Sequence, residues 1–168
     1  MSYRGLLLGL LLVLTGCAAR TPLPEQLPEL SSDLPLSLII ARSQPDAPAQ
    51  SWLLVLQAEG PSLRWSLFDP LGIPLARQLL NNGAWHNDGL LPPNDEAREL
   101  FAALLFALSQ PTALSKHYAA EQWRAVSTSQ RWLTPDWQIS YRAPLDFTLH
   151  NDHGLRYDVQ APALEEGS

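Results

Sequence analysis

The side chains that could hold a metal ion or transfer a proton are scattered along this chain of 168 residues, with few groupings at a useful spacing. Two of the four histidines, His150 and His153, flank Asp152 in a stretch that reads as a tight turn. A zinc site usually needs about three or four ligands, so solvated turn histidines are the default interpretation. Asp95 and Glu96 stand where a helix is expected to begin, which indicates capping rather than a pair of catalytic carboxylates.

The sequence also lacks the motifs of common enzyme classes. The chain has neither a G-x-S-x-G nucleophile turn nor a Gly-rich phosphate-binding loop. We therefore expect no enzyme activity, no metal and no cofactor. The net charge is −6, with 11 Lys and Arg against 17 Asp and Glu. The basic residues form no cluster, which argues against a nucleic-acid partner and against adhesion to anionic lipid.

Cys17 is the one cysteine, and the residues before it predict its chemistry. Residues 1–4 are a short basic start, residues 6–14 are almost all leucine, and two small residues follow. This pattern is typical of a secretory signal peptide. Leu14-Thr15-Gly16-Cys17 resembles the lipobox of bacterial lipoproteins, which implies cleavage before Cys17 and acylation of its thiol and new amino group. The alternative is a transmembrane anchor, but the apolar run is shorter than the roughly 20 residues that a span needs.

Acylation would set both the redox chemistry and the location of the mature chain. It would consume the sole thiol, so no disulfide, thiol catalysis or Cys-based metal site would remain. By resemblance to enterobacterial lipoproteins, Ala18 after the cysteine favours the outer membrane, with the domain facing the periplasm. The expected organisation is a signal peptide at 1–16, a lipidated Cys17 with a Pro-rich tether at 17–35, one domain at 36–161 and a flexible tail at 162–168.

The rest of the chain predicts strands, then helices, then strands. Apolar and polar residues alternate over 63–67, as in a half-buried strand, and Asn81-Asn82-Gly83 predicts a hairpin turn. Asn94 is a good N-cap for a helix with apolar residues at helical spacing, and Pro111 ends that helix. Together the elements favour an α+β fold, a curved antiparallel sheet with helices packed on its concave face. Strands are expected over 36–42, 52–58, 63–68, 75–80, 84–86, 123–126, 130–133, 136–142, 147–151 and 155–160, and a second helix over 112–120.

Six tryptophans are many for a chain of this length, and they leave two interpretations open. Their large rings could fill a solid core, or they could line an apolar cavity or a membrane-facing rim. A cavity would take its lining from the strands and from the longer helix. The expected lining residues are Trp52, Leu54, Trp65, Leu67, Phe101, Leu104, Leu105 and Leu108.

The connection between the third and fourth predicted strands carries aliphatic residues where loops usually carry polar ones. Pro70 and Gly72 define a turn, and this turn presents Leu71 and Ile73. The two side chains could insert into a membrane or a partner. They could equally fold back over the core, and the sequence leaves both possibilities open.

The stretch Trp65-Ser66-Leu67-Phe68-Asp69-Pro70-Leu71-Gly72, at the end of a strand and downstream of a lipobox, resembles the LolB family. Members of that family are outer-membrane lipoproteins that receive lipoproteins from a periplasmic carrier and insert them. The resemblance implies an open, LolA/LolB-like half-barrel with an apolar cavity for acyl chains, and a role of Leu71 in membrane transfer. The mature chain resembles still more closely an uncharacterised family of bacterial lipoproteins associated with gene clusters for aryl polyene pigments.

We therefore expect a membrane-anchored lipoprotein that binds an acyl or polyene chain and helps to transfer it to the outer membrane. Its expected partners are membrane lipid through acylated Cys17, this hydrophobic cargo, and a periplasmic LolA-like carrier. Covalent chemistry is not needed, because the cargo moves between apolar sites. The alternative is a non-catalytic structural accessory of an envelope complex. A continuous cavity favours the first function, whereas a solid core with an exposed apolar patch favours the second. An anchored hydrolase would need a polar cleft that no motif indicates.

Overall fold

The computed structural model describes residues 20–163, so the predicted signal peptide, the lipidation of Cys17 and residues 164–168 of the predicted tail lie outside the described residues. The described residues form one antiparallel sheet of ten strands and two helices. The strands are β1 (Leu36–Ser43), β2 (Gln50–Glu59), β3 (Ser62–Phe68), β4 (Pro74–Asn81), β5 (Ala84–Asn87), β6 (Trp123–Ser127), β7 (Gln130–Leu133), β8 (Trp137–Ala143), β9 (Asp146–His150) and β10 (Arg156–Gln160). The helices are α2 (Asp95–Leu108) and α3 (Pro111–His117).

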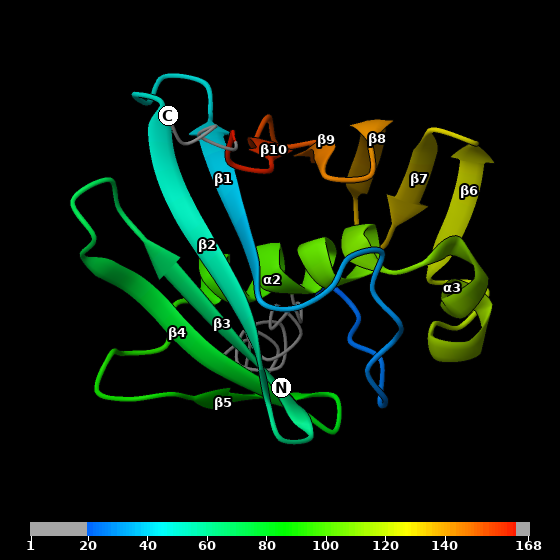
Figure 1. Ribbon diagram of the computed structural model, residues 1–168. Coiled ribbons are helices and arrows are strands. Elements are labelled where there is room, and N and C mark those ends of the chain that lie inside the picture. The colour runs from blue at the N-terminus through cyan, green and yellow to red at the C-terminus, as the bar shows by residue number, and fades with distance from the viewer. Residues whose placement is uncertain (1–19, 164–168) are drawn as a thin grey trace, which may run out of the picture.

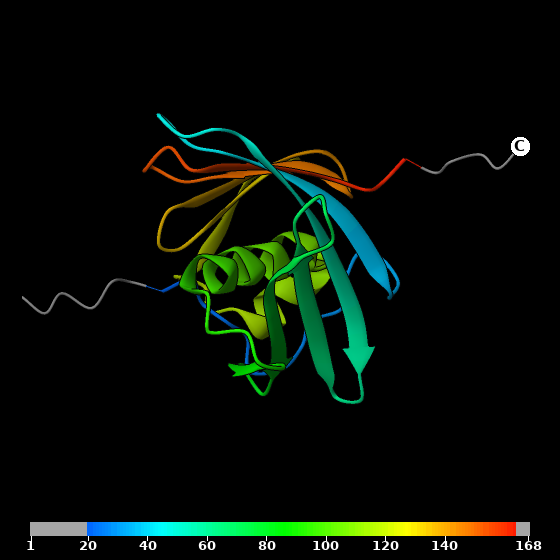
Figure 2. The same ribbon diagram turned by 90° about the vertical axis from the view of Figure 1, so that its left-hand side faces the viewer.

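The sheet consists of two antiparallel meanders that meet in its centre. Its strand order is β5-β4-β3-β2-β1-β10-β9-β8-β7-β6, so the first and last strands pair with each other. The edges are β5 and β6, and the sheet is not closed. The two helices connect these edges, and the sheet curves around α2, which lies on its concave side (Figures 1 and 2). The predicted curved antiparallel sheet with helices is confirmed.

Helix α2 begins as predicted and is almost wholly enclosed. The side chain of Asn94 accepts a hydrogen bond of 3.0 Å from the backbone N–H of Ala97, which caps the first turn. Every residue from 100 to 108 is buried, on all sides of the helix. A helix that is apolar all round has to be surrounded by other structure, and the curved sheet supplies most of that structure.

The shorter helix ends earlier than the sequence predicted. It was expected over residues 112–120, but α3 ends at His117 and Tyr118 has an extended backbone. The ring of Tyr118 is buried and packs edge-on against Phe106 of α2, with 5.2 Å between the ring centroids. This tertiary contact replaces the last helical turn.

Residues 20–35 are bound to the domain, which corrects their prediction as a tether. The backbone N–H of Thr21 donates to Glu99 Oε2 at 2.8 Å, and Trp137 Nε1 donates to Thr21 Oγ1 at 2.8 Å. The backbone N–H of Ser31 donates to the carbonyl oxygen of Leu108 at 2.7 Å. Prolines favour extended backbone, and this extended segment supplies a donor to a carbonyl that the end of α2 leaves unpaired. The folded domain therefore includes residues in the range 20–35 as well as those from 36 onward.

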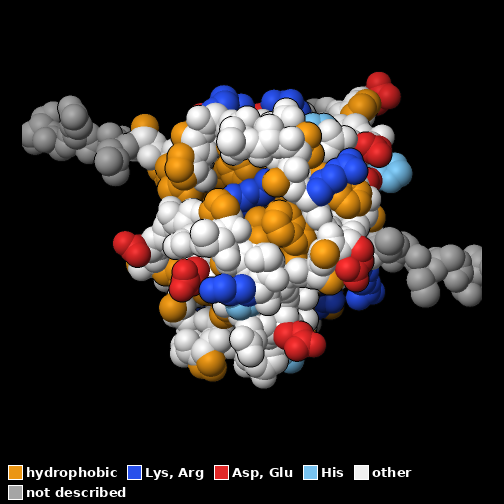
Figure 3. Space-filling view, turned by 90° about the vertical axis from the view of Figure 1, so that its right-hand side faces the viewer, with side chains coloured by type: hydrophobic (Ala, Val, Ile, Leu, Met, Phe, Trp, Pro, Cys, Tyr) orange, Lys and Arg blue, Asp and Glu red, His pale blue; other side chains and the backbone are white. Residues whose placement is uncertain are grey.

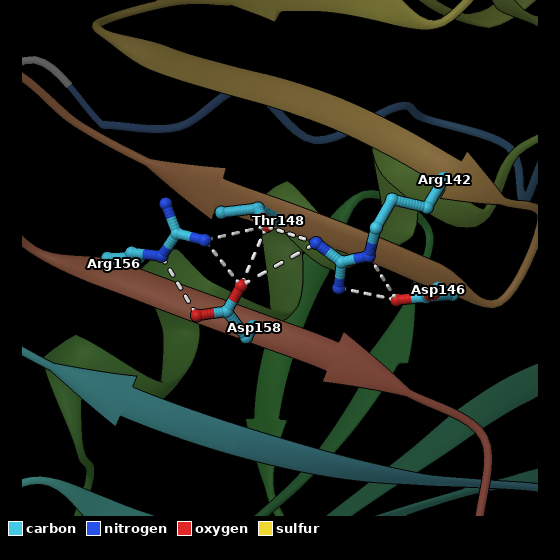
Figure 4. A network of polar contacts seen from close by, with 5 residues as sticks. All are labelled: Arg142, Asp146, Thr148, Arg156 and Asp158. Carbon is cyan, nitrogen blue, oxygen red and sulfur yellow. Dashed lines mark hydrogen bonds and ion pairs between the residues drawn. The ribbon is translucent and has the colours of Figure 1, made fainter.

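The convex face of β8, β9 and β10 carries a network of charged side chains (Figure 4). Arg156 Nε and Nη2 donate to the two carboxylate oxygens of Asp158 at 2.8 and 2.7 Å, and the hydroxyl of Thr148 donates to Asp158 Oδ1 at 2.8 Å. Arg142 Nε donates to Asp146 Oδ1 at 2.9 Å. Hydrogen bonds from Arg156 hold the pKa of Asp158 below its usual value. The two arginines are paired with two aspartates, so this face presents a neutral surface rather than a basic patch.

Candidate functional site

The β3–β4 loop (residues 69–73) is built around the carboxylate of Asp69. The backbone N–H groups of Leu71 and Ile73 donate to Asp69 Oδ1 at 2.9 and 2.8 Å. The backbone N–H of Gly72 donates to the carbonyl oxygen of Asp69 at 3.0 Å, and that of Asp69 donates to the carbonyl oxygen of Ile73 at 3.0 Å. Gly72 has a φ of 79°, which favours glycine. The loop therefore has a fixed shape before it meets any partner.

The fixed loop points its aliphatic side chains into solvent. Leu71 is 85% exposed and Ile73 is 54% exposed, and Pro70 beside them is exposed as well. Of the two interpretations that the sequence left open, folding back over the core is excluded. Exposing two bulky aliphatic side chains to water is unfavourable, so the loop is a candidate contact site.

A cleft of about 500 Å³, here called the loop cleft, lies directly beside this loop. Its apolar wall includes Trp52, Leu67, Pro70 and Leu75, and Glu96 lines it from the N-terminal turn of α2. Ligand sites in proteins usually have volumes of about 300–1,000 Å³. The loop cleft thus combines a suitable volume, an apolar wall and an opening next to the exposed loop.

A second cleft of about 810 Å³, here called the helix cleft, lies along the first turns of α2. Leu23, Trp85 and Trp137 form part of its apolar surface, and charged side chains that include Arg98 and Glu99 lie around it. The clefts share Glu96, which lines both of them. This residue stands between the two spaces at the start of α2.

Glu96 is held by two partners from the sheet. Tyr157 OH donates to Glu96 Oε1 at 2.7 Å, and Arg42 Nη2 donates to Glu96 Oε2 at 3.3 Å. Burial opposes ionisation of Glu96, but the hydrogen bonds from Arg42 and Tyr157 outweigh it and lower the pKa of the carboxyl group. Burial, together with the bond to Glu96, raises the pKa of Tyr157. Both pKa values move away from neutrality, so this cluster is suited to holding α2 in place rather than to acid–base catalysis.

A row of aromatic rings connects the walls of the two clefts. The Trp52 and Tyr157 ring centroids are 6.0 Å apart, and those of Tyr157 and Trp137 are 6.1 Å apart. Trp52 lines the loop cleft and Trp137 lines the helix cleft, whereas Tyr157 is fully buried between them. The aromatic row and Glu96 together form the partition between the clefts.

The residues predicted to line a cavity fall into two groups in the structure. Trp52 and Leu67 do line the loop cleft. The others are fully buried in the core and line neither cleft; Trp65, for example, stacks on Phe101 with 5.2 Å between ring centroids. At these positions the interior is filled by side chains. The residues concerned are Leu54, Trp65, Phe101, Leu104, Leu105 and Leu108.

The two histidines lie at the end of a strand and in the turn that follows it. His150 ends β9, whereas His153 lies in the turn after it, 84% exposed, with its Nε2 3.6 Å from Asp136 Oδ2. Across residues 20–163, no three His, Cys, Asp or Glu side chains are grouped so that they could hold a metal ion. In the same residues, no helix has the length and apolar character needed to cross a membrane.

Sequence reasoning missed the partners that position the site. An Asp followed by Pro-x-Gly is a recognisable turn signal, so the role of Asp69 could have been predicted. The cluster at Glu96 has no such signal, because its partners Arg42 and Tyr157 lie 54 and 61 residues away in the chain.

Comparison with known proteins identified no relative of this chain. No family model matches the chain, and no curated protein matches it either.

Proposed function

We propose that this protein is an outer-membrane lipoprotein, LolB-like in fold, that binds a hydrophobic cargo such as an acyl or polyene chain and helps to pass it to the membrane. The observation that carries this proposal is the β3–β4 loop. It holds Leu71, 85% exposed, on a rigid tip beside a cleft of about 500 Å³ whose lining is partly apolar and partly polar. A preformed loop loses little conformational entropy when it inserts, so most of the apolar area gained is available for membrane contact.

The cargo would lie in the loop cleft, against Trp52 and Leu75, and would leave past the exposed loop. Transfer of this kind needs no covalent step, because the apolar chain exchanges one apolar environment for another. Anchorage through acylated Cys17 and a periplasmic carrier as the donor belong to the same proposal. Acyl chains would keep the protein at the membrane, since each buried CH2 contributes about 0.8 kcal/mol.

The filled core favours a second candidate, a structural accessory that braces an envelope complex. Leu104 and its neighbours on α2 are fully buried, which indicates packed side chains rather than a cavity at these positions. In this function the exposed loop would contact another protein rather than lipid. The two candidates differ in whether an apolar chain binds in the loop cleft.

Transfer of a fluorescent lipid to vesicles distinguishes the candidates. The full-length chain is reconstituted in phosphatidylcholine vesicles, and a conjugated tetraene fatty acid is supplied on serum albumin. Entry of the tetraene into the bilayer is timed by its fluorescence. We expect entry to be faster than into protein-free vesicles. An equal rate would contradict lipid transfer and favour the accessory function.

Variants of the loop identify Leu71 as the contact. Leu71→Asp should abolish the acceleration, because a carboxylate is costly to press into a bilayer. Leu71→Ala should weaken it less, by up to about 2 kcal/mol at about 0.8 kcal/mol per CH2. Val126→Asp on β6 is the matched control, since Val126 is 57% exposed on the other edge of the sheet. A large loss of thermal stability in Leu71→Asp would show that Leu71 is a core residue, contrary to the proposal.

A further inference from the structure

A second exposed aliphatic tip lies in the β5–α2 loop (residues 88–94), outside both clefts' apolar walls. Leu90 is 104% exposed, the largest value among the exposed hydrophobic residues of the described chain. Pro92 and Pro93 after it are exposed as well, and Leu91 is half-buried. A run of apolar residues at a loop tip is unusual, because loops normally present polar residues to water.

The β5–α2 loop is held at both ends. Arg64 Nε and Arg77 Nη2 donate to Asp88 Oδ2 at 2.8 and 3.0 Å, which fixes the start of the loop to β3 and β4. Asn94 fixes its end as the N-cap of α2. Gly89 has a φ of 97°, so the backbone turns sharply before Leu90. The tip is therefore presented by anchored backbone, as in the β3–β4 loop.

Both tips lie on the same side of the molecule. The β3–β4 loop and the β5–α2 loop are both at the left-hand side in Figure 1, and both face the viewer in Figure 2. Neither loop contains Lys or Arg. Their acidic side chains are engaged within the fold, Asp69 by backbone N–H groups and Asp88 by arginines. Burial of the tips would thus not remove these two carboxylates from their partners.

The amino end of the described chain is held close to the same end of α2. Thr21 donates its backbone N–H to Glu99, in the second turn of α2, and the β5–α2 loop leads into the first turn. Residue 20 follows the predicted lipidation site, Cys17, by three residues, and three residues can span at most roughly 10 Å. An acylated Cys17 would hold this end of the domain against the bilayer.

We infer that Leu90 and its loop form a second membrane contact, which acts together with Leu71 to orient the domain on the bilayer that holds its anchor. This inference rests on the proposed function. The occupant is a phospholipid bilayer, because both tips carry exposed aliphatic side chains on the same side of the molecule, and because this end of the domain lies only a few residues from the predicted anchor at Cys17. Since neither loop is basic, zwitterionic lipid suffices and anionic lipid adds no affinity.

Fluorescent labels on the full-length chain test the inference. Leu90→Cys, Leu71→Cys and Val126→Cys are each labelled with an environment-sensitive fluorophore and reconstituted in phosphatidylcholine vesicles with or without nitroxide-bearing lipid. The unsubstituted chain, whose sole cysteine is Cys17, provides the background. Val126 is the control because β6 lies at the opposite edge of the sheet, where apolar side chains are interspersed with charged ones (Figure 3).

We expect the labels at 90 and 71 to shift their emission to the blue and to lose most of it to the nitroxide lipid, while the label at 126 does neither. Adding Leu90→Asp to the Leu71→Cys chain should reduce quenching at 71. Quenching at 71 alone would overturn the second contact and leave the proposed function standing. Quenching at neither loop would contradict both the second contact and the proposed function. Equal quenching at all three positions would contradict the inferred orientation of the domain on the bilayer.

Discussion

Truncation of Leu104 tests whether the interior of the domain is a solid core. Leu104 lies in the middle of α2 and is 0% exposed. The helix is buried on every side from residue 100 to 108, so a space left at this position has no loose loop that could fill it. Leu104→Ala removes apolar area and leaves a cavity, and Leu104→Asp adds an unpaired buried carboxylate.

The expected magnitudes separate these variants. A buried Leu→Ala substitution costs about 2–5 kcal/mol, depending on how far the surroundings relax. For a domain of this size, each kcal/mol lowers the Tm by about 2–4 °C, so we expect a fall of roughly 4–20 °C. A buried charge without a partner adds a further penalty of several kcal/mol. Total stability is usually about 5–15 kcal/mol, and Leu104→Asp should therefore unfold the domain at ordinary temperature.

Thermal unfolding followed by circular dichroism measures both effects. Leu90→Ala is the matched control, because the same side chain is truncated at a position that is 104% exposed. Its stability should lie within about 0.5 kcal/mol of the parent. A Tm for Leu104→Ala within a few degrees of the parent would show that this face of α2 borders space rather than packed side chains. That result would favour the interpretation that the tryptophans and leucines line a cavity rather than fill a solid core.

The remaining predictions concern the anchor, the pH response and the amino-terminal segment. Cys17→Ala should fractionate as a soluble periplasmic protein, and persistence in the membrane fraction would contradict the lipid anchor. The lowered pKa of Glu96 means that its ionised form stabilises the fold above the titration range of a free Glu, about pH 4.3, and that this contribution is lost as the pH falls through the lower folded-state pKa. The Tm difference between the parent and Glu96→Gln should therefore shrink from pH 7 to pH 3, and a constant difference would refute the role of the carboxylate. Thr21→Val should cost about 1–3 kcal/mol by leaving the Trp137 indole N–H buried without its acceptor, whereas an unchanged urea midpoint would show that this bond contributes nothing.

Most of the secondary structure was predictable because its signals are local. The alternation in β3, the Asn-Asn-Gly turn between β4 and β5, and the N-cap Asn94 all depend on neighbours a few residues away. The pairing of β1 with β10 is different, because it joins residues more than a hundred positions apart, such as Ile40 and Val159. The curvature predicted for the sheet followed from the fold class and from no individual residue.

The site was predictable only in part, for a related reason. Leu71 could be placed at the tip of a turn, but its exposure depends on whether the fold leaves a surface for it to cover. Prolines at 22, 24 and 28 read the same in a free tether and in a segment bound to the domain. Apolar residues such as Trp52 and Trp65 likewise read the same at a cleft wall and in a core, and only the packing of α2 distinguishes them.

The filled core constrains how this protein could handle a lipid. To enter between α2 and the sheet, an apolar chain would have to displace side chains such as Leu104 and Phe101, at a cost comparable to that of a large core truncation. The loop cleft requires no such displacement, because it is already open and its wall already contains Trp52 and Leu75. A cargo bound there would remain next to Leu71 and therefore next to the bilayer. Exchange would then depend on contact between the loop and the membrane rather than on opening of the fold, which makes the loops the decisive place for mutation.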